Sequence, residues 1–198
     1  MASDFHPVGA VARAVAEAAS AFAGRPLLVY GHCGGVALAT EVATLLERAG
    51  ADLRGPLVGA SYPPHTADGF DDDPFAPVDD VELAGQFAKL GGFSGLTAEE
   101  AATIGRLLRH DGTEARRYFR RALESGKSRL RAPLTCLIGA DDPLTTDYAD
   151  GWLSWGRFAV DHELVVLPGD HYFVREHAAH VARHLLAALD PTPAEVTA

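Results

Sequence analysis

The chain has 198 residues, 47% of them hydrophobic, which predicts one globular domain (1–198) rather than a disordered segment. Its formal charge of −10 argues against a nucleic-acid partner, because phosphate binding needs a basic surface. Two cysteines provide neither a disulfide framework nor zinc spacing, and no apolar run approaches the roughly 20 residues of a membrane span. We therefore expect a cytoplasmic protein with no metal, no cofactor and no membrane contact. Arg13 and Glu17 interrupt the Ala-rich stretch 7–23, which we interpret as a helix and not as a signal peptide.

Two strands and two helices are predicted in the first third of the chain. Residues 7–23 carry apolar side chains at helical spacing. Residues 27–30 form a short continuous apolar run, which is typical of a strand buried on both faces. A second helix is predicted over 35–49, closed by Gly50, and a second strand over 57–61.

The rest of the chain continues this alternation after one interruption. Strands are predicted over 134–138 and 163–167, followed by a closing helix over 174–189. Buried strands that alternate with helices predict a parallel α/β sheet. Residues 80–126 have helical character and contain no strand, so we predict that 65–130 is a helical insertion over the carboxyl ends of the strands, here called the lid.

The segment between the first strand and the second helix carries the clearest chemical motif. Gly31-His-Cys-Gly-Gly35 has the form G-x-C-x-G, which is the nucleophile-elbow pattern with cysteine in place of serine. The glycines permit a sharp turn that lifts Cys33 to the start of a helix, where the helix dipole favours an anion. We predict Cys33 as the nucleophile and the N–H of Gly34 as an oxyanion donor. The alternative is that Cys33 is a small buried hydrophobic residue.

An acidic turn, Gly139-Ala-Asp-Asp-Pro143, follows the third predicted strand, and a histidine loop follows the fourth. The triads of α/β-hydrolases run in the order nucleophile, acid, histidine. His171 is therefore the predicted general base, and Asp142 the acid that orients it. Asp142 is preferred because it directly precedes the turn proline, with Asp141 as the alternative. Asp170 adjoins His171 and is interpreted as a turn residue.

The remaining cysteine and histidines have simpler interpretations. Cys136 lies in the middle of a predicted strand and is expected in the core. His177, His180 and His184 share one side of the closing helix and could in principle bind a metal, but the apolar stripe of that helix leaves them toward solvent. His32 is expected to shape the entrance to the site and not to act as the base.

Basic residues gather on the predicted lid. Nine of the 17 Lys and Arg fall between Arg106 and Arg131. This clustering indicates either an ordinary solvated helix face or a docking surface for an acidic partner. The docking hypothesis rests on four arginines: Arg116, Arg117, Arg120 and Arg121.

These motifs together resemble the thioesterase family of polyketide and nonribosomal-peptide assembly lines, and the free-standing type II thioesterases in particular. The likeness covers about residues 8–189. It is carried by Gly31-His-Cys-Gly-Gly35, Leu90-Gly-Gly92, Arg109-His-Asp-Gly-Thr-Glu-Ala-Arg-Arg-Tyr118, Gly139-Ala-Asp-Asp-Pro143, Trp152 and Pro168-Gly-Asp-His-Tyr-Phe173. The resemblance implies an α/β-hydrolase-like three-layer sandwich with a mostly parallel sheet and a helical lid. It also implies an acyl-thioester substrate carried by an acyl or peptidyl carrier protein, as used in antibiotic biosynthesis.

The chain departs from this family at two points. The family's serine is replaced by Cys33, and cysteine versions of the fold include acyl transferases and cyclases as well as hydrolases. Integrated domains often carry the acid after the second strand, where this chain has Gly59-Ala-Ser61, which returns the role to Asp142.

The second departure is the short N-terminal segment. Only 32 residues precede Cys33, fewer than the family normally has. The strand 27–30 is therefore expected at an exposed edge that pairs with a second copy or with a complementing N-terminal fragment.

The alternative function from another class is a non-catalytic or degenerate hydrolase-like module that binds a carrier protein or an acyl chain. A further alternative is a cysteine hydrolase of small esters or lactones.

Overall fold

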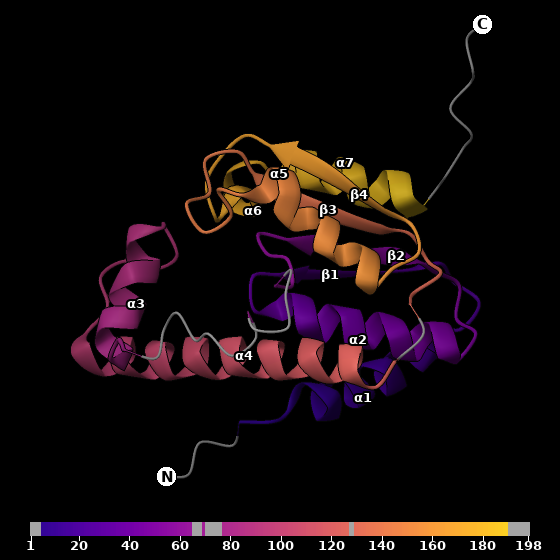
Figure 1. Cartoon of the computed structure of the whole chain (residues 1–198), viewed down its shortest axis with the longest axis horizontal. Coiled ribbons are helices and arrows are strands. Elements are labelled where there is room, and N and C mark those ends of the chain that lie inside the picture. Colours follow the sequence, from indigo (N-terminus) through magenta and orange to yellow (C-terminus); the bar gives the residue numbers. More distant parts are fainter. Residues whose placement is uncertain (1–4, 65–68, 70–76, 127–128, 190–198) are drawn as a thin grey trace, which may run out of the picture.

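A parallel sheet forms the centre of the fold in the computed structural model, which describes residues 5–64, 69, 77–126 and 129–189 (Figure 1). Its strands are β1 (Leu27–His32), β2 (Leu53–Gly59), β3 (Leu134–Gly139) and β4 (His162–Leu167), and they lie in that order across the sheet. All neighbouring strands pair in parallel, so their carboxyl ends meet at one edge. The predicted parallel α/β sheet is confirmed.

Helices cover both faces of the sheet, which makes the three predicted layers. α1 (Val8–Ala19) and α2 (Gly35–Arg48) pack on one face, and α7 (Ala178–Leu189) packs on the other (Figure 1). Successive side chains of a strand point to opposite faces. On β2, accordingly, Val58 belongs to the core under α2, and Leu57 belongs to the core under α7.

The core on the α2 face is completed by a short segment between β3 and β4. This segment contains α5 (Tyr148–Gly151) and the 3₁₀ helix η3 (Trp152–Arg157). Trp155 of η3 is fully buried and packs with Cys136 of β3 in the same cluster. Cys136 is itself 0% exposed, which confirms its predicted place in the core.

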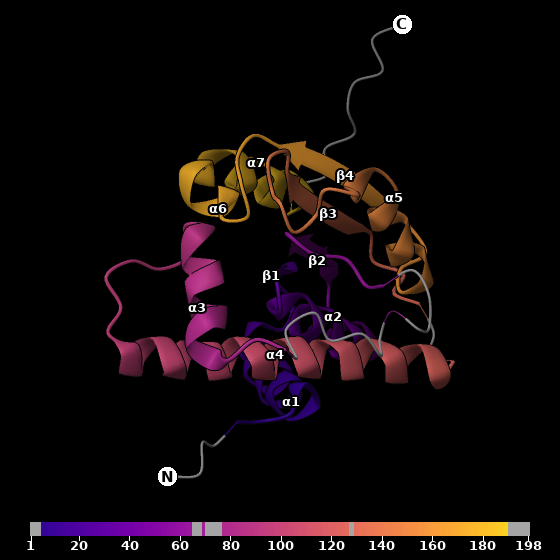
Figure 2. The same ribbon diagram turned by 60° about the vertical axis from the view of Figure 1, so that its left-hand side comes forward.

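Two helices, α3 (Asp80–Lys89) and α4 (Ala98–Glu124), form the described part of the lid. α3 rises from the start of α4 and reaches toward the carboxyl ends of the strands (Figure 2). α4 begins with a capping box in which Thr97 and Glu100 satisfy each other's backbone N–H groups. Residues 65–68, 70–76 and 127–128 of the predicted lid lie outside the described residues.

Polar contacts fix both ends of α3. At its first residue, Asp80 Oδ1 accepts a hydrogen bond from Arg109 Nε of α4 at 3.0 Å. Beyond its last turn, the carbonyls of Gly91 and Gly92 accept hydrogen bonds from Arg175 Nη1 at 2.9 and 3.1 Å. Arg175 lies on α6 (Phe173–Glu176), directly after the predicted histidine loop, so the lid is attached to the edge of the sheet where the carboxyl ends of the strands meet.

The boundaries of three predicted elements were wrong. The second strand spans Leu53–Gly59 instead of 57–61, because Ala60 adopts a left-handed conformation (φ 56°) that ends the strand. The closing helix is divided at His177 into α6 and α7. The first helix ends at Ala19 and continues as a 3₁₀ turn, η1 (Ser20–Phe22).

Two further expectations concerned the place of β1 in the sheet and membrane-spanning helices. β1 lies at one edge of the sheet and pairs, within the described chain, with β2. None of the described helices is both long enough and apolar enough to cross a membrane.

Candidate active site

The turn between β1 and α2 has the geometry of a nucleophile elbow. Cys33 has φ 52°, a conformation that L-residues rarely adopt and that concentrates at functional sites. Its N–H donates to the carbonyl of Gly59 at 2.8 Å, which ties the turn to the end of β2. A Cβ on Gly31 would lie 2.6 Å from both Ala39 Cβ and the Gly35 carbonyl oxygen. Glycine is therefore required at position 31 for the helix to pack so closely on the strand.

The two predicted partners of Cys33 lie in the loops after β3 and β4. Nδ1 of His171 and Oδ2 of Asp142 are 2.9 Å apart, and both side chains are buried. The other oxygen of Asp142, Oδ1, accepts the N–H of Leu144 at 2.9 Å. Asp141 is exposed instead, so the structure pairs the imidazole with Asp142. Asp170 Oδ1 accepts the N–H of Tyr172 at 2.8 Å, which makes Asp170 a turn residue.

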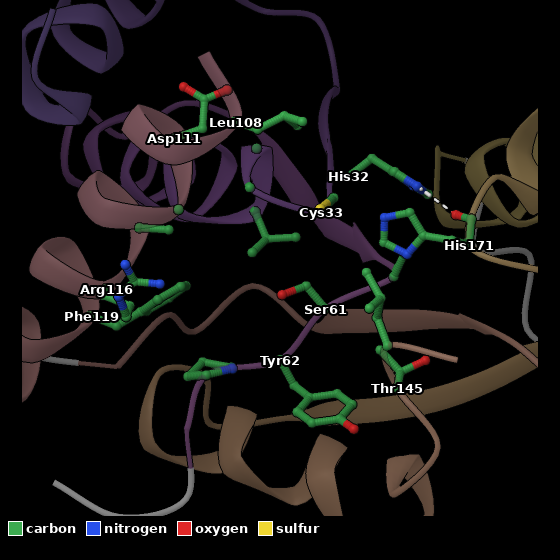
Figure 3. Close-up of a pocket in the computed structure, with 18 of the residues that line it drawn as sticks. His32, Cys33, Ser61, Tyr62, Leu108, Asp111, Arg116, Phe119, Thr145 and His171 are labelled. Carbon is green, nitrogen blue, oxygen red and sulfur yellow. Dashed lines mark hydrogen bonds between the residues drawn. The ribbon is translucent and has the colours of Figure 1, made fainter. Parts of the chain in front are cut away.

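The remaining nitrogen of His171 faces Cys33, the predicted nucleophile. Nε2 is buried, makes no hydrogen bond to any described nitrogen or oxygen atom, and points toward Cys33 (Figure 3). Burial alone would lower the pKa of His171. The hydrogen bond to Asp142 and the interaction with Cys33 outweigh that effect and raise the pKa to about 9. The site therefore stabilises the imidazolium, the form that His171 takes after it removes a proton from a thiol.

Gly34, the predicted oxyanion donor, stands at the N-cap of α2, directly after Cys33. A Cβ there would lie 3.1 Å from Cβ of Asp111 on α4. α4 therefore passes close over the start of α2 and leaves little room at the backbone beside Cys33.

A cavity of about 480 Å³ opens beside Cys33 and His171 (Figure 3). Its apolar walls come from α2, the end of β2, the lid and the loop after β3: Val36, Ala60, Phe87, Leu108, Ala115, Phe119 and Leu144. Cys33 and Ala60 are the two non-glycine residues with positive φ in the described part of the chain, and both line this cavity. Sequence reasoning missed the inner wall after β2, where Ser61 also lines the cavity, because the strand was extended through these residues.

The arginines of α4 do not form one surface. Arg116 is half-buried and lines the cavity, whereas Arg117 is exposed and pairs with Glu114 at 3.1 Å. Four residues later the same division recurs, with Arg120 half-buried and Arg121 exposed. A docking surface on this helix would therefore use Arg117 and Arg121.

The histidines of the closing helix form no metal site that the structure shows. The rings of His177 and His180 lie 5.7 Å apart, and His184 is half-buried. Within residues 5–64, 69, 77–126 and 129–189, no three His, Cys, Asp or Glu side chains are placed to hold a metal ion.

A strained elbow, a buried acid–imidazole pair and a cavity at the carboxyl edge of a parallel sheet define an α/β-hydrolase type of site. Comparison with known proteins gives the family. Residues 4–189 match the thioesterase domain family, and the chain belongs to it.

Two curated relatives each match more than four fifths of this chain. The probable cadicidin biosynthesis thioesterase of Streptomyces griseus is 32% identical over 175 residues, which cover 84% of this chain and 45% of that protein. Erythronolide synthase EryA3 of Saccharopolyspora erythraea is 28% identical over 177 residues, which cover 83% of this chain and 5% of that protein. The chain thus spans less than half of either relative.

Solved structures share the fold. The type II thioesterase BorB of the borrelidin cluster superimposes with a TM-score of 0.72 at 23% identity, over 93% of this chain and 74% of BorB. RedJ, a thioesterase of the prodiginine pathway in Streptomyces coelicolor, superimposes with a TM-score of 0.70 at 25% identity, over 92% of this chain and 71% of RedJ.

Proposed function

We propose that the protein is an acyl-thioester-processing enzyme of polyketide or nonribosomal-peptide biosynthesis, with Cys33 as nucleophile, His171 as general base and Asp142 as the acid that orients it. The observation that carries this proposal is the buried Nε2 of His171, which faces Cys33 while Nδ1 is held by Asp142 at 2.9 Å. A buried polar nitrogen left without a nitrogen or oxygen partner is costly, so its place beside a thiol indicates proton transfer.

In the first half of the reaction, His171 removes the proton of the Cys33 thiol, and the sulfur attacks the carbonyl carbon of the substrate thioester. The backbone N–H of Gly34 stabilises the resulting oxyanion. The intermediate collapses, the imidazolium of His171 protonates the departing carrier thiol, and the acyl group remains on Cys33 as a new thioester.

In the second half, His171 removes a proton from water or from a hydroxyl, amine or carbon acid within the acyl chain. That nucleophile attacks the acyl-enzyme, and the products are a free acid or a ring together with the regenerated thiol. Because the acyl-enzyme is a thioester, it remains a good donor to nucleophiles other than water. Acyl transfer and cyclisation are therefore proposed alongside hydrolysis.

The proposed partner is an acyl or peptidyl carrier protein. The support for it is the family, together with the exposed positive charge of Arg117 and Arg121 on α4. Reversal of both to Glu is expected to raise KM for a carrier-bound substrate while KM for a small acyl-cysteamine thioester stays the same. An equal rise in KM for both substrates would show that Arg117 and Arg121 do not dock the carrier protein.

Intact-mass spectrometry after incubation with acyl-cysteamine and acyl-carrier thioesters tests the chemistry. The wild type and a Cys136→Ala control are expected to gain the mass of the acyl group, whereas Cys33→Ala gains none. Asp142→Asn is expected to slow adduct formation, and its neighbour Asp141→Asn to leave it unchanged. Neither adduct nor turnover with any thioester would favour the alternative function, a non-catalytic module that binds a carrier protein or an acyl chain.

A further inference from the structure

His32, the residue before the nucleophile, is tied on both sides of its imidazole. Nε2 lies 2.8 Å from the backbone carbonyl oxygen of His171. Nδ1 lies 2.9 Å from the hydroxyl oxygen of Tyr30. A carbonyl can only accept, so Nε2 carries the hydrogen and donates. Nδ1 then accepts, and the Tyr30 hydroxyl is its donor.

The hydrogen bonds define a chain that runs from β1 to the histidine loop. The Tyr30 hydroxyl fixes the tautomer of His32, and His32 in turn holds the peptide group of His171. Burial lowers the pKa of His32 to about 4, so the ring stays neutral and keeps this tautomer at neutral pH.

The surroundings of His32 leave its ring little freedom. The ring packs against His171 with centroids 5.4 Å apart and against Phe173 with centroids 5.5 Å apart. On the β2 side, a Cβ on Gly59 would lie 2.7 Å from the Tyr30 hydroxyl and 2.9 Å from His32 Nδ1. The neighbouring strand therefore needs a glycine at the point where the two side chains meet.

Two anchors thus hold His171, and they act on different parts of it. Asp142 fixes the tilt of the ring through Nδ1 at 2.9 Å. His32 fixes the main chain, and with it the origin of the side chain, through the carbonyl. Because His32 adjoins Cys33, the same short segment that presents the sulfur also positions the backbone of the base (Figure 3).

We propose that His32 is a positioning residue for the reaction: its Nε2–H, oriented by Tyr30, holds the main chain of His171 so that the imidazole of His171 faces the Cys33 sulfur. This proposal rests on the proposed function, in which His171 is the general base for Cys33.

Two substitutions at position 32 separate hydrogen bonding from packing. Both His32→Gln and His32→Asn remove the ring. The amide nitrogen of Gln reaches about as far as Nε2 and can still donate to the His171 carbonyl, whereas Asn is too short. A merely structural role predicts parallel losses in rate and in Tm for the two variants.

The readouts are single-turnover acylation by an acyl-cysteamine thioester and alkylation of Cys33 by iodoacetamide. A displacement of a catalytic group by about 1 Å can cost on the order of 100-fold in rate. We expect His32→Asn to slow acylation by about that factor with little change in KM, and also to slow alkylation. His32→Gln is expected to retain acylation within severalfold of the wild type at a similar Tm to the Asn variant.

Tyr30→Phe provides an independent test that leaves the His32 ring in place. It is expected to slow acylation by a smaller factor than His32→Asn while Tm changes little. Equal acylation rates in the Gln and Asn variants, or an unchanged rate in Tyr30→Phe, would overturn the proposal. If the wild type is not acylated at all, the proposed function fails. The alkylation rates of the three variants then still decide whether His32 positions His171 beside the thiol.

Discussion

Gly105 lies at a close backbone contact between the two lid helices, and it gives the sharpest quantitative prediction. A Cβ at this position of α4 would lie 1.8 Å from the carbonyl oxygen of Asp80 and 2.4 Å from its carbonyl carbon, at the start of α3. Real Cβ atoms essentially never approach closer than 3.0 Å, so Gly105→Ala requires the two backbones to move apart by at least a further 1.2 Å at this contact. Both opposing atoms are backbone, so no side chain can rotate away.

The expected loss of stability follows from two opposing effects. Overpacking costs about 1–3 kcal/mol, and this backbone clash belongs at the upper end. The better helix propensity of alanine offsets about 1 kcal/mol of this loss in the free energy of unfolding. The net loss of about 2 kcal/mol corresponds to a fall in Tm of about 4–8 °C in a chain of this size.

Gly85 on α3 is the matched control, because a Cβ there meets no atom within 4 Å. Gly85→Ala is expected to gain about 1 kcal/mol from helix propensity and to raise Tm by about 2–4 °C. Thermal unfolding followed by circular dichroism compares both variants with the wild type. If Gly105→Ala melts at or above the wild-type temperature, the close approach of α3 to α4 is wrong.

Three further predictions test the site and its attachment to the lid. Iodoacetamide should label Cys33 and spare Cys136 in the folded protein, because burial raises the pKa of Cys136 to about 12; peptide mapping that finds Cys136 labelled would contradict this. The ratio kcat/KM should rise with pH up to about 9, because His171 must be neutral to remove the proton of the Cys33 thiol, and Asp142→Asn should move this rise to lower pH because the charge that stabilises the imidazolium is gone; a rise that stays at the same pH in Asp142→Asn would argue against the pairing. Arg175→Ala removes the hydrogen bonds to the Gly91 and Gly92 carbonyls after α3, so amide hydrogen exchange should accelerate in α3 and not in the sheet. Equal exchange in the wild type and the variant would refute the attachment of α3 through Arg175.

The strands and the elbow were predictable because their signals are local. β1, β3 and β4 each contain a short, mostly apolar run, and the G-x-C-x-G turn follows from residue types alone. The start of β2 was missed because Gly55 and Pro56 interrupt its apolar run, although parallel pairing with β1 includes both positions. The break at His177 was missed because the surrounding sequence keeps helical spacing across it.

The orientation of neighbouring side chains could not be predicted with the same certainty. Asp141 and Asp142 follow the same strand, and only the turn decides which one points inward. The N–H of Asp141 is held by the Gly169 carbonyl at 2.9 Å, and the N–H of Asp142 by the Gly139 carbonyl at 3.2 Å. This arrangement buries the carboxylate of Asp142 and leaves that of Asp141 exposed to solvent. The predicted arginine patch was divided for a similar reason, since adjacent positions on a helix face different directions.

The walls of the cavity come from two parts of the chain, the turns at the end of the sheet and the inserted helices. Cys33 and His171 stand on turns fastened to the sheet, whereas Phe87 and Phe119 belong to helices inserted between two strands. Substitutions in the inserted helices can therefore reshape the cavity while Cys33 and His171 keep their supports. Such a division lets a lineage, or a protein engineer, diversify the accepted substrates without rebuilding the chemistry.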